Sequence, residues 1–118
     1  MRDFHSLLVW QRAHALTLEF YRVTAEFPGH ERYGLTSQLR RAGASIPTNL
    51  AEGCGHDSSM EFARFVGIAL ASASEVEYHL LLAKDLGYVA EQRWQVLSPM
   101  VEEVKRMLTG LRRRLRGS

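Results

Sequence analysis

The histidine and acidic side chains of this sequence could bind a metal, but their spacing argues against a site. A di-iron centre in a helical bundle takes Glu-x-x-His from two helices, and none of the five histidines follows a glutamate by three residues. Glu75 and His79 are four residues apart and could share one face of a helix. Two ligands do not complete a metal site, so we expect a surface or interface pair, with neither metal nor cofactor.

Cys54 and His56 are residue types that could act as a nucleophile and its base. They are two residues apart in a glycine-rich loop, without a third catalytic member. The loop also lacks the lysine of a phosphate-binding loop, so a turn explains it. A helical ribonuclease of the HEPN type would need an arginine followed, after four to six intervening residues, by a histidine, and no such sequence occurs. The sequence therefore predicts that the protein is not an enzyme.

A third set of residues is polar but carries few charges. It recurs at steps of three, four, four and three residues: Gln38, Arg41, Ser45, Asn49 and Glu52. Glu52 lies near the end of its expected helix, where the helix dipole disfavours an anion, so a fixed partner is expected. We predict a hydrogen-bonded network between helices or subunits, without a ligand, in which Glu52 accepts from the next helix near Ser58 and Ser59. An Arg41–Glu75 ion pair would fit an antiparallel hairpin.

Four apolar stripes with helical spacing position these side chains. Their members are Val9, Ala13, Leu16, Phe20, Val23 and Phe27; Leu35, Leu39, Ala42, Ile46 and Leu50; Phe62, Val66, Ala69, Ala73, Val76, Leu80 and Ala83; and Leu97, Val101, Val104, Leu108, Leu111 and Leu115. Steps of three and four residues predict helices, and no stretch alternates with the period of a strand. Short connections place consecutive helices antiparallel. We therefore predict an all-α fold, an up-down-up-down antiparallel four-helix bundle.

Local signals place the helix ends. Thr36 is the expected N-cap of the second helix, and Pro47 within that helix should kink it. The third helix begins at a capping box formed by Ser58 and Glu61. For the fourth, we prefer a helix from about residue 90 that kinks at Pro99, over a helix that begins there.

Composition limits the classes of protein to which this chain can belong. The 118 residues, 46% hydrophobic and 24% charged, fit one globular domain over residues 1–118. A single cysteine cannot form an internal disulfide and fits a reducing compartment. The N-terminus lacks the pattern of a signal peptide, and no uninterrupted apolar run approaches the ~20 residues of a membrane span. We expect a cytoplasmic protein without a membrane partner.

Apolar residues outside the four stripes exceed what one small bundle can bury. They are Leu8, Trp10, Leu18, Tyr21, Phe65, Ile68, Leu82, Leu86, Trp94 and Met107. Some widen the core-facing stripes, and the remainder suggest an oligomer interface. Gly67, Ala71 and Ser74 would let another helix approach the third helix closely, either inside the bundle or in a second subunit.

Gln38 and Arg41 of the polar set lie in the stretch Leu35-Thr36-Ser37-Gln38-Leu39-Arg40-Arg41-Ala42. Ser45, Asn49 and Glu52 belong to a specific motif that follows it, Ser45-Ile46-Pro47-Thr48-Asn49-Leu50-Ala51-Glu52-Gly53. With Phe27-Pro28, Tyr33-Gly34-Leu35, Glu61-Phe62 and Leu86-Gly87-Tyr88, it resembles the four-helix bundle family named for proteins encoded in 23S ribosomal RNA intervening sequences. The resemblance covers nearly the whole chain. Its signature positions are Arg41, Ser45, Pro47, Asn49, Glu52 and Gly53. The sequence departs from the family at Cys54 and at Gly43, where a better helix former is usual and where the helix should loosen.

This resemblance implies a small bacterial protein that forms a ring-shaped homopentamer and has no established enzymatic activity. The chain is also similar to the accessory bundle protein of diversity-generating retroelements, a remote relative of this family. That relative associates with a reverse transcriptase and binds nucleic acid through basic surfaces.

Two functions remain open at this point. A net charge of +2 and a sequence pI near 9.0 permit nucleic-acid binding without requiring it. In the first hypothesis, basic residues contact RNA or DNA phosphates: Arg40, Arg112, Arg113, Arg114 and Arg116. In the second, the protein is an oligomeric scaffold for another protein, and the arginines belong to a solvated tail. We expect that tail, residues 112–118, to fray.

Overall fold

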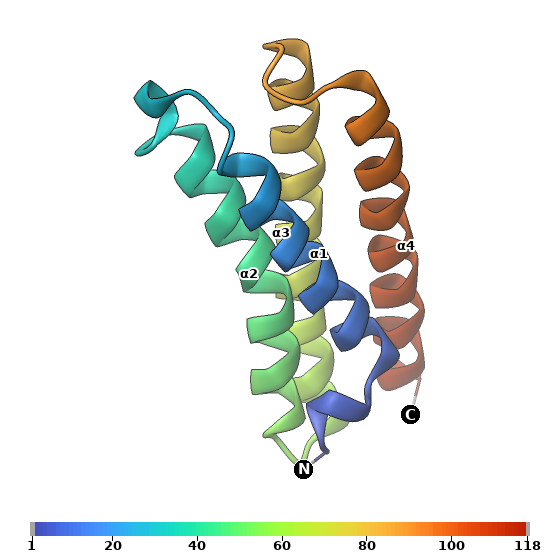
Figure 1. Ribbon diagram of the computed structural model, residues 1–118. Helices are drawn as coiled ribbons and strands as arrows, with labels where there is room; N and C mark the ends of the chain where they lie inside the picture. The colour runs from blue at the N-terminus through green and yellow to red at the C-terminus, as the bar shows by residue number, and fades with distance from the viewer. Residues whose placement is uncertain (1, 118) are drawn as a thin grey trace.

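The computed structural model describes residues 2–117. Its regular elements are η1 (Phe4–Ser6), α1 (Leu8–Thr24), η2 (Gly29–Glu31), α2 (Leu35–Cys54), α3 (Ser59–Asp85) and α4 (Glu91–Arg116). Consecutive helices run antiparallel along a body of 45 × 24 × 20 Å (Figure 1). Residues 2–117 contain no strand. The predicted all-α antiparallel bundle is therefore confirmed.

One apolar core fills the space between the helices. α1 and α3 each pack against both α2 and α4. Every member of the four predicted stripes is buried except Leu111, which is half-buried. Phe20 and Phe62 are the largest fully buried side chains. The helical period of the apolar residues thus identified most of the core, while the buried Cys54, Ala63, Phe65 and Val89 lie outside the predicted stripes.

The helix ends agree only in part with the sequence signals. Ser58 caps α3, and its Oγ accepts from Glu61 N at 3.2 Å. The carboxylate of Glu61 binds Arg64, so the reciprocal bond of a capping box is replaced by an ion pair. The prediction for Thr36 was wrong, because α2 begins at Leu35 with Gly34 as its cap residue. α2 and α4 continue as single helices through their internal prolines, which confirms the long fourth helix.

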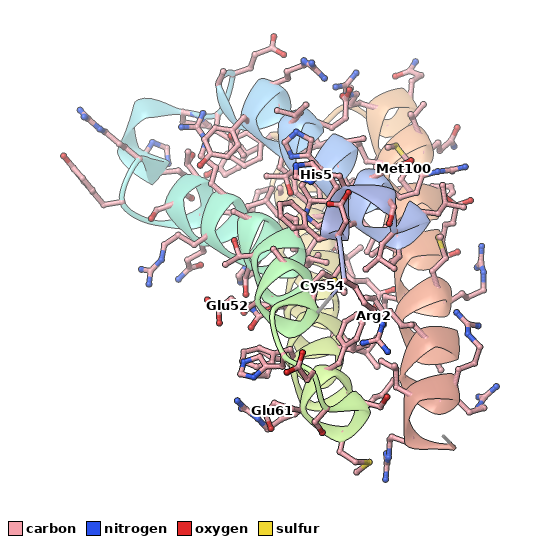
Figure 2. All side chains as sticks on the ribbon, turned by 90° about the horizontal axis from the view of Figure 1, so that it is seen from below. Arg2, His5, Glu52, Cys54, Glu61 and Met100 are labelled. Carbon is pink, nitrogen blue, oxygen red and sulfur yellow. The ribbon has the colours of Figure 1, made fainter. Side chains whose placement is uncertain are left out.

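The N-terminal segment covers the end of the bundle where α2 leads into α3. The backbone N–H of Arg2 donates to the carbonyl of Cys54 at 2.9 Å, and its guanidinium lies 5.0 Å from the centre of the Phe62 ring. Figure 2 shows Arg2 and Cys54 close together in the view from below. η1 is capped by Asp3, whose carboxylate accepts from His5 N at 3.1 Å. This segment shields Cys54 from solvent.

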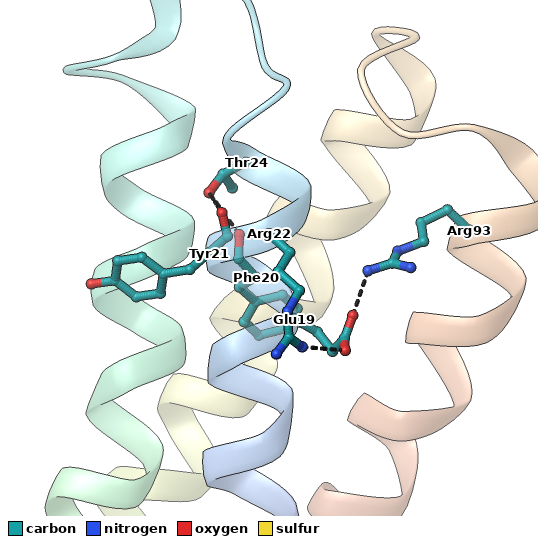
Figure 3. A network of polar contacts seen from close by, with 6 residues as sticks. All are labelled: Glu19, Phe20, Tyr21, Arg22, Thr24 and Arg93. Carbon is teal, nitrogen blue, oxygen red and sulfur yellow. Dashed lines mark hydrogen bonds and ion pairs between the residues drawn. The ribbon is translucent and has the colours of Figure 1, made fainter.

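Ion pairs join α1 to α4 along one edge of the bundle. The carboxylate of Glu19 contacts the guanidinium groups of Arg22, at 2.7 Å, and of Arg93 on α4 (Figure 3). Arg12 and Glu103 form a second pair between the same helices at 2.7 Å. Exposed pairs of this kind contribute about 0–1 kcal/mol each. The apolar core therefore sets the orientation of α1.

At one end of the bundle, Glu31 connects two loops. Its Oε1 accepts from Leu35 N at 3.1 Å, and its Oε2 accepts from the Tyr88 hydroxyl at 3.0 Å. The bond from Leu35 N, and next the bond from Tyr88, lower the pKa of Glu31 below its ordinary value. The ionised carboxylate thus serves as the N-terminal acceptor for α2 and fixes the loop before α4.

The lowered pKa of Glu31 gives stability a pH dependence. The stabilisation is present above the pKa of Glu31 in the unfolded chain, about 4.3. It is lost as the pH falls through the lower pKa of the folded state. We expect Glu31→Gln to be less stable than the unaltered protein at pH 7, with the difference narrowing as the pH falls below the pKa of Glu31 in the unfolded chain. Urea unfolding of both proteins over this range would measure it, and a difference independent of pH would contradict it.

α3 is the one helix within residues 2–117 that is long and apolar enough to cross a membrane by length and composition. Its mean hydropathy over the relevant window is 1.3, and 33% of that window is buried inside the bundle. Charged residues interrupt this helix, so its sequence contains no long continuous apolar run. In the structure α3 packs between α2 and α4, and much of its apolar surface faces outward.

Candidate functional site

The residues first considered for chemistry do not assemble into a catalytic or metal-binding site. Cys54 is buried, and burial raises the pKa of its thiol, which disfavours the nucleophilic thiolate. His56 is exposed and stacks on Phe65. His79 Nε2 lies 3.9 Å from Glu75 Oε2. Within residues 2–117, no group of three or more His, Cys, Asp or Glu side chains could hold a metal ion.

Arginines converge instead at the end of the groove between α3 and α4. One hollow of about 260 Å³ is lined by Leu70, Thr109, Arg112, Arg113 and Arg116. A neighbouring hollow of about 230 Å³ is lined by Met60, Ala63, Arg64, Arg112 and Arg116. We refer to the two hollows and their four arginines, Arg64, Arg112, Arg113 and Arg116, as the arginine groove. Arg112 and Arg116 line both hollows.

Helical spacing and antiparallel packing explain this arrangement. Thr109, Arg112, Arg113 and Arg116 follow one another by three, one and three residues, which places them along one side of α4. The antiparallel pairing brings the last turns of α4 beside the first turns of α3, which carry Arg64. Leu115 is buried and anchors the end of α4. Residues 112–116 are helical and differ from the expected frayed tail, while Ser118 lies outside the described residues.

The charges of the arginine groove are only partly balanced. Arg64 pairs with Glu61 at 2.8 Å. Among residues 2–117, no ion pair involves Arg112, Arg113 or Arg116. The groove therefore has an excess of positive charge and guanidinium groups suited to an oxyanion.

The structure separates Arg40 and Arg114 from the arginine groove. Arg40 Nε donates to Thr24 Oγ1 at 2.7 Å, and its guanidinium lies 4.6 Å from the centre of the Tyr21 ring. It thereby joins the start of α2 to the end of α1, at the opposite end of the bundle from the C-terminus (Figure 1). Arg114 lines neither hollow of the groove. The five arginines proposed from sequence thus do not form one surface in a single chain.

Part of the predicted polar network forms between α2 and α3. Ser45 Oγ lies 2.9 Å from Ser72 Oγ, and Asn49 Nδ2 donates to the backbone O of Ser45 at 2.8 Å and to its Oγ at 3.0 Å. Ser72 was missed in the sequence because nothing distinguishes it there from the nearby Ser74. This polar contact joins the two helices through their side chains.

The outer members of the polar set are not in that network. Gln38 and Arg41 line an open hollow of about 360 Å³ with Ala42, Ser45, Ser72 and Glu75. No ion pair joins Arg41 to Glu75 among the described residues. Glu52 is exposed and points away from the bundle (Figure 2). Its predicted bond near Ser58 is not formed, because Ser58 instead caps the first turn of α3 through Glu61 N.

Gly53, the last signature residue, has a packing role. A Cβ atom added there would lie 2.7 Å from Cδ1 of Phe62. The glycine lets the buried Phe62 ring pack directly against α2. This close approach explains the glycine without any ligand.

The outer surface of α3 exposes several apolar side chains beside the charged Glu75 and Glu77. Among its side chains, Ile68 is 38% exposed, Tyr78 60% and Leu81 41%. Ala71 and Ser74 are also exposed, so the bundle does not use them for internal helix packing. Tyr78, Leu81 and Trp94 line a hollow of about 360 Å³ beside α4. This surface is of the kind that mediates protein contacts.

These features define a small helical bundle protein with a basic groove and, in residues 2–117, no cluster of metal ligands. The family model for the 23S rRNA-intervening sequence protein matches residues 5–110. The chain belongs to this family, which confirms the resemblance seen in its sequence.

A solved structure with the same fold is a protein of unknown function from the S23 ribosomal protein family of Bacteroides thetaiotaomicron. The TM-score is 0.83 at 20% sequence identity, covering 90% of this chain and 96% of the other. At that identity the likeness establishes the fold alone. The search of curated proteins found no match.

Proposed function

We propose that this protein is a non-enzymatic, oligomeric bundle that binds RNA or DNA phosphates through the arginine groove. The observation that carries the proposal is the convergence of Arg112, Arg113 and Arg116 on one groove, where none of them has a carboxylate partner among residues 2–117. Guanidinium groups bind phosphate oxygens through two parallel hydrogen bonds. Such contacts give affinity without reading sequence.

Oligomerisation would strengthen a weak site. The formal net charge of one chain is only +2, and phosphate contacts weaken steeply as salt rises. Several grooves on one assembly would bind one strand at high effective concentration. The family resemblance supports a homopentamer, and a single buried thiol fits a reducing cytoplasm.

Fluorescence anisotropy with labelled single-stranded RNA and DNA would test this proposal. We expect log affinity to fall linearly with log salt concentration. Replacing both Arg112 and Arg116 with alanine should weaken binding about tenfold near physiological salt and make the salt slope shallower. The matched control replaces Arg32 and Arg106, two exposed arginines outside the groove, and should change affinity much less. Absence of binding even at low salt, or equal losses in both variants, would contradict the proposal.

A second candidate function is that of a scaffold for another protein. The exposed apolar residues of α3 favour it, because such a surface gains free energy when a partner covers it. In this case, replacing Arg112 and Arg116 would leave partner binding unchanged. The double replacement of Arg112 and Arg116 therefore distinguishes the two functions, because it should weaken nucleic-acid binding but leave binding of a protein partner unchanged.

A further inference from the structure

We propose that the arginine groove recognises the terminal phosphate of a nucleic-acid strand in preference to an internal phosphodiester, with Arg112 as the pre-oriented contact. This inference rests on the proposed function and specifies the ligand of the same groove. It follows from how Arg112 is held, from an unsatisfied donor, and from the charge of the groove.

Arg112 lies against the backbone of α3 at Gly67. A Cβ atom added at Gly67 would be 3.3 Å from each of the Cζ, Nε and Nη2 atoms of Arg112. The guanidinium therefore occupies space that any other residue at position 67 would begin to fill. An arginine side chain fixed in this way loses little further conformational freedom on binding an anion.

The same guanidinium has an unmet hydrogen-bonding requirement. Arg112 Nε is buried and has no hydrogen-bond partner. A buried donor without an acceptor destabilises a protein, and so does a glycine within a helix. Both unfavourable features meet at the contact between Arg112 and Gly67. Local features that lower stability, such as these two, concentrate at functional sites. An oxyanion bound in the adjoining hollows would offer hydrogen-bond acceptors to this guanidinium.

The charge of the groove favours a dianion. Arg112, Arg113 and Arg116 have no carboxylate partner among residues 2–117, and Arg64 is paired with Glu61. A terminal phosphate has a charge of about −1.5 to −2 at pH 7 and three acceptor oxygens. An internal phosphodiester has a single charge and two free oxygens. Arg112 and Arg116 line both hollows, and each hollow has a third arginine, Arg113 in one and Arg64 in the other. A phosphate group in either hollow would therefore meet several guanidinium groups.

The test compares three 12-nucleotide strands of one sequence, with fluorescein on an internal base. One has a 5′-phosphate, one a 3′-phosphate, and one hydroxyl groups at both ends. We expect at least one phosphorylated strand to bind about tenfold more tightly than the hydroxyl strand. Arg112→Gln should abolish this preference, whereas Arg106→Gln, an equal loss of charge on an exposed part of α4, should retain it.

Gly67→Leu provides a second variant that keeps every arginine. Its side chain would occupy the position of the Arg112 guanidinium, so we expect the preference to disappear. Equal affinity of the unaltered protein for all three strands would overturn the inference and leave the proposed function intact. Absence of binding to any strand would overturn both. A preference that persists in Arg112→Gln and Gly67→Leu would place it outside this groove and overturn the inference.

Discussion

Replacing Gly43 with alanine is expected to lower the free energy of unfolding by about 2–3 kcal/mol, although alanine is the better helix former. A Cβ atom at this position would lie 2.6 Å from Cδ2 and 3.2 Å from Cε2 of Phe20. Phe20 is fully buried in the core. Protein interiors are closely packed, so we expect the ring to yield only by displacing neighbouring core side chains or by shifting α1 relative to α2.

Urea unfolding followed by circular dichroism would measure this loss. Gly110→Ala is the matched control, because Gly110 also lies inside a helix and the nearest contact of its added Cβ would be an ordinary 3.5 Å. We expect that control to be stabilised by up to about 1 kcal/mol.

Making the Gly43→Ala change in a Phe20→Leu protein separates the effect of packing on stability from the effect of helix propensity. Phe20→Leu removes the ring that meets the new methyl group, so Gly43→Ala should be much less destabilising in that background than alone. A Gly43→Ala protein as stable as the original would contradict the packing explanation.

Introducing charge on the outer surface of α3 is expected to dissociate the proposed oligomer. A double replacement, Ile68→Glu and Tyr78→Glu, should raise the dissociation constant by about 100-fold or more, because each buried unpaired carboxylate strongly opposes association. Both side chains are exposed in the single chain, so the fold itself should tolerate the change. Sedimentation velocity at micromolar concentration would show the change in mass.

Leu18→Glu is the control for this experiment. Leu18 is 43% exposed and lies on α1, away from the outer surface of α3. We expect the assembly to persist in this variant. A monomeric unaltered protein, or an α3 variant that keeps its full mass, would exclude this surface as the interface.

The apolar period of the sequence was enough to predict the helices and most of their core. Residues three and four apart share one face of a helix. Phe20, Leu50 and Val76 each belong to such a stripe on a different helix, and all three are buried in the core. Turn signals were less reliable. Thr36 has the right side chain for a cap, yet Glu31 reaches Leu35 N from the preceding loop. This carboxylate lies four residues before the amide that it caps, outside the N-cap position that the capping rule considers.

The candidate site was predicted only in part, because it depends on contacts between helices. The C-terminal arginines were recognised from their composition but were assigned to a fraying tail. Only the pairing of α3 with α4 brings Arg112 against Gly67 and places Arg64 beside it. Gly43 was expected to loosen α2, whereas it makes room for Phe20. The sequence shows where both glycines are, but it does not show which side chains pack against them.

The position of the arginine groove gives the bundle two unlike ends. The groove lies where α4 finishes, whereas the opposite end holds Glu31 and Tyr88 and the mixed charges of Glu19, Arg22 and Arg93. If the subunits of a ring stand parallel to its axis, these ends become two rims with different chemistry. A strand of nucleic acid would then meet the ring from one side only. The other rim, which carries charges of both signs, would not attract the strand in the same way.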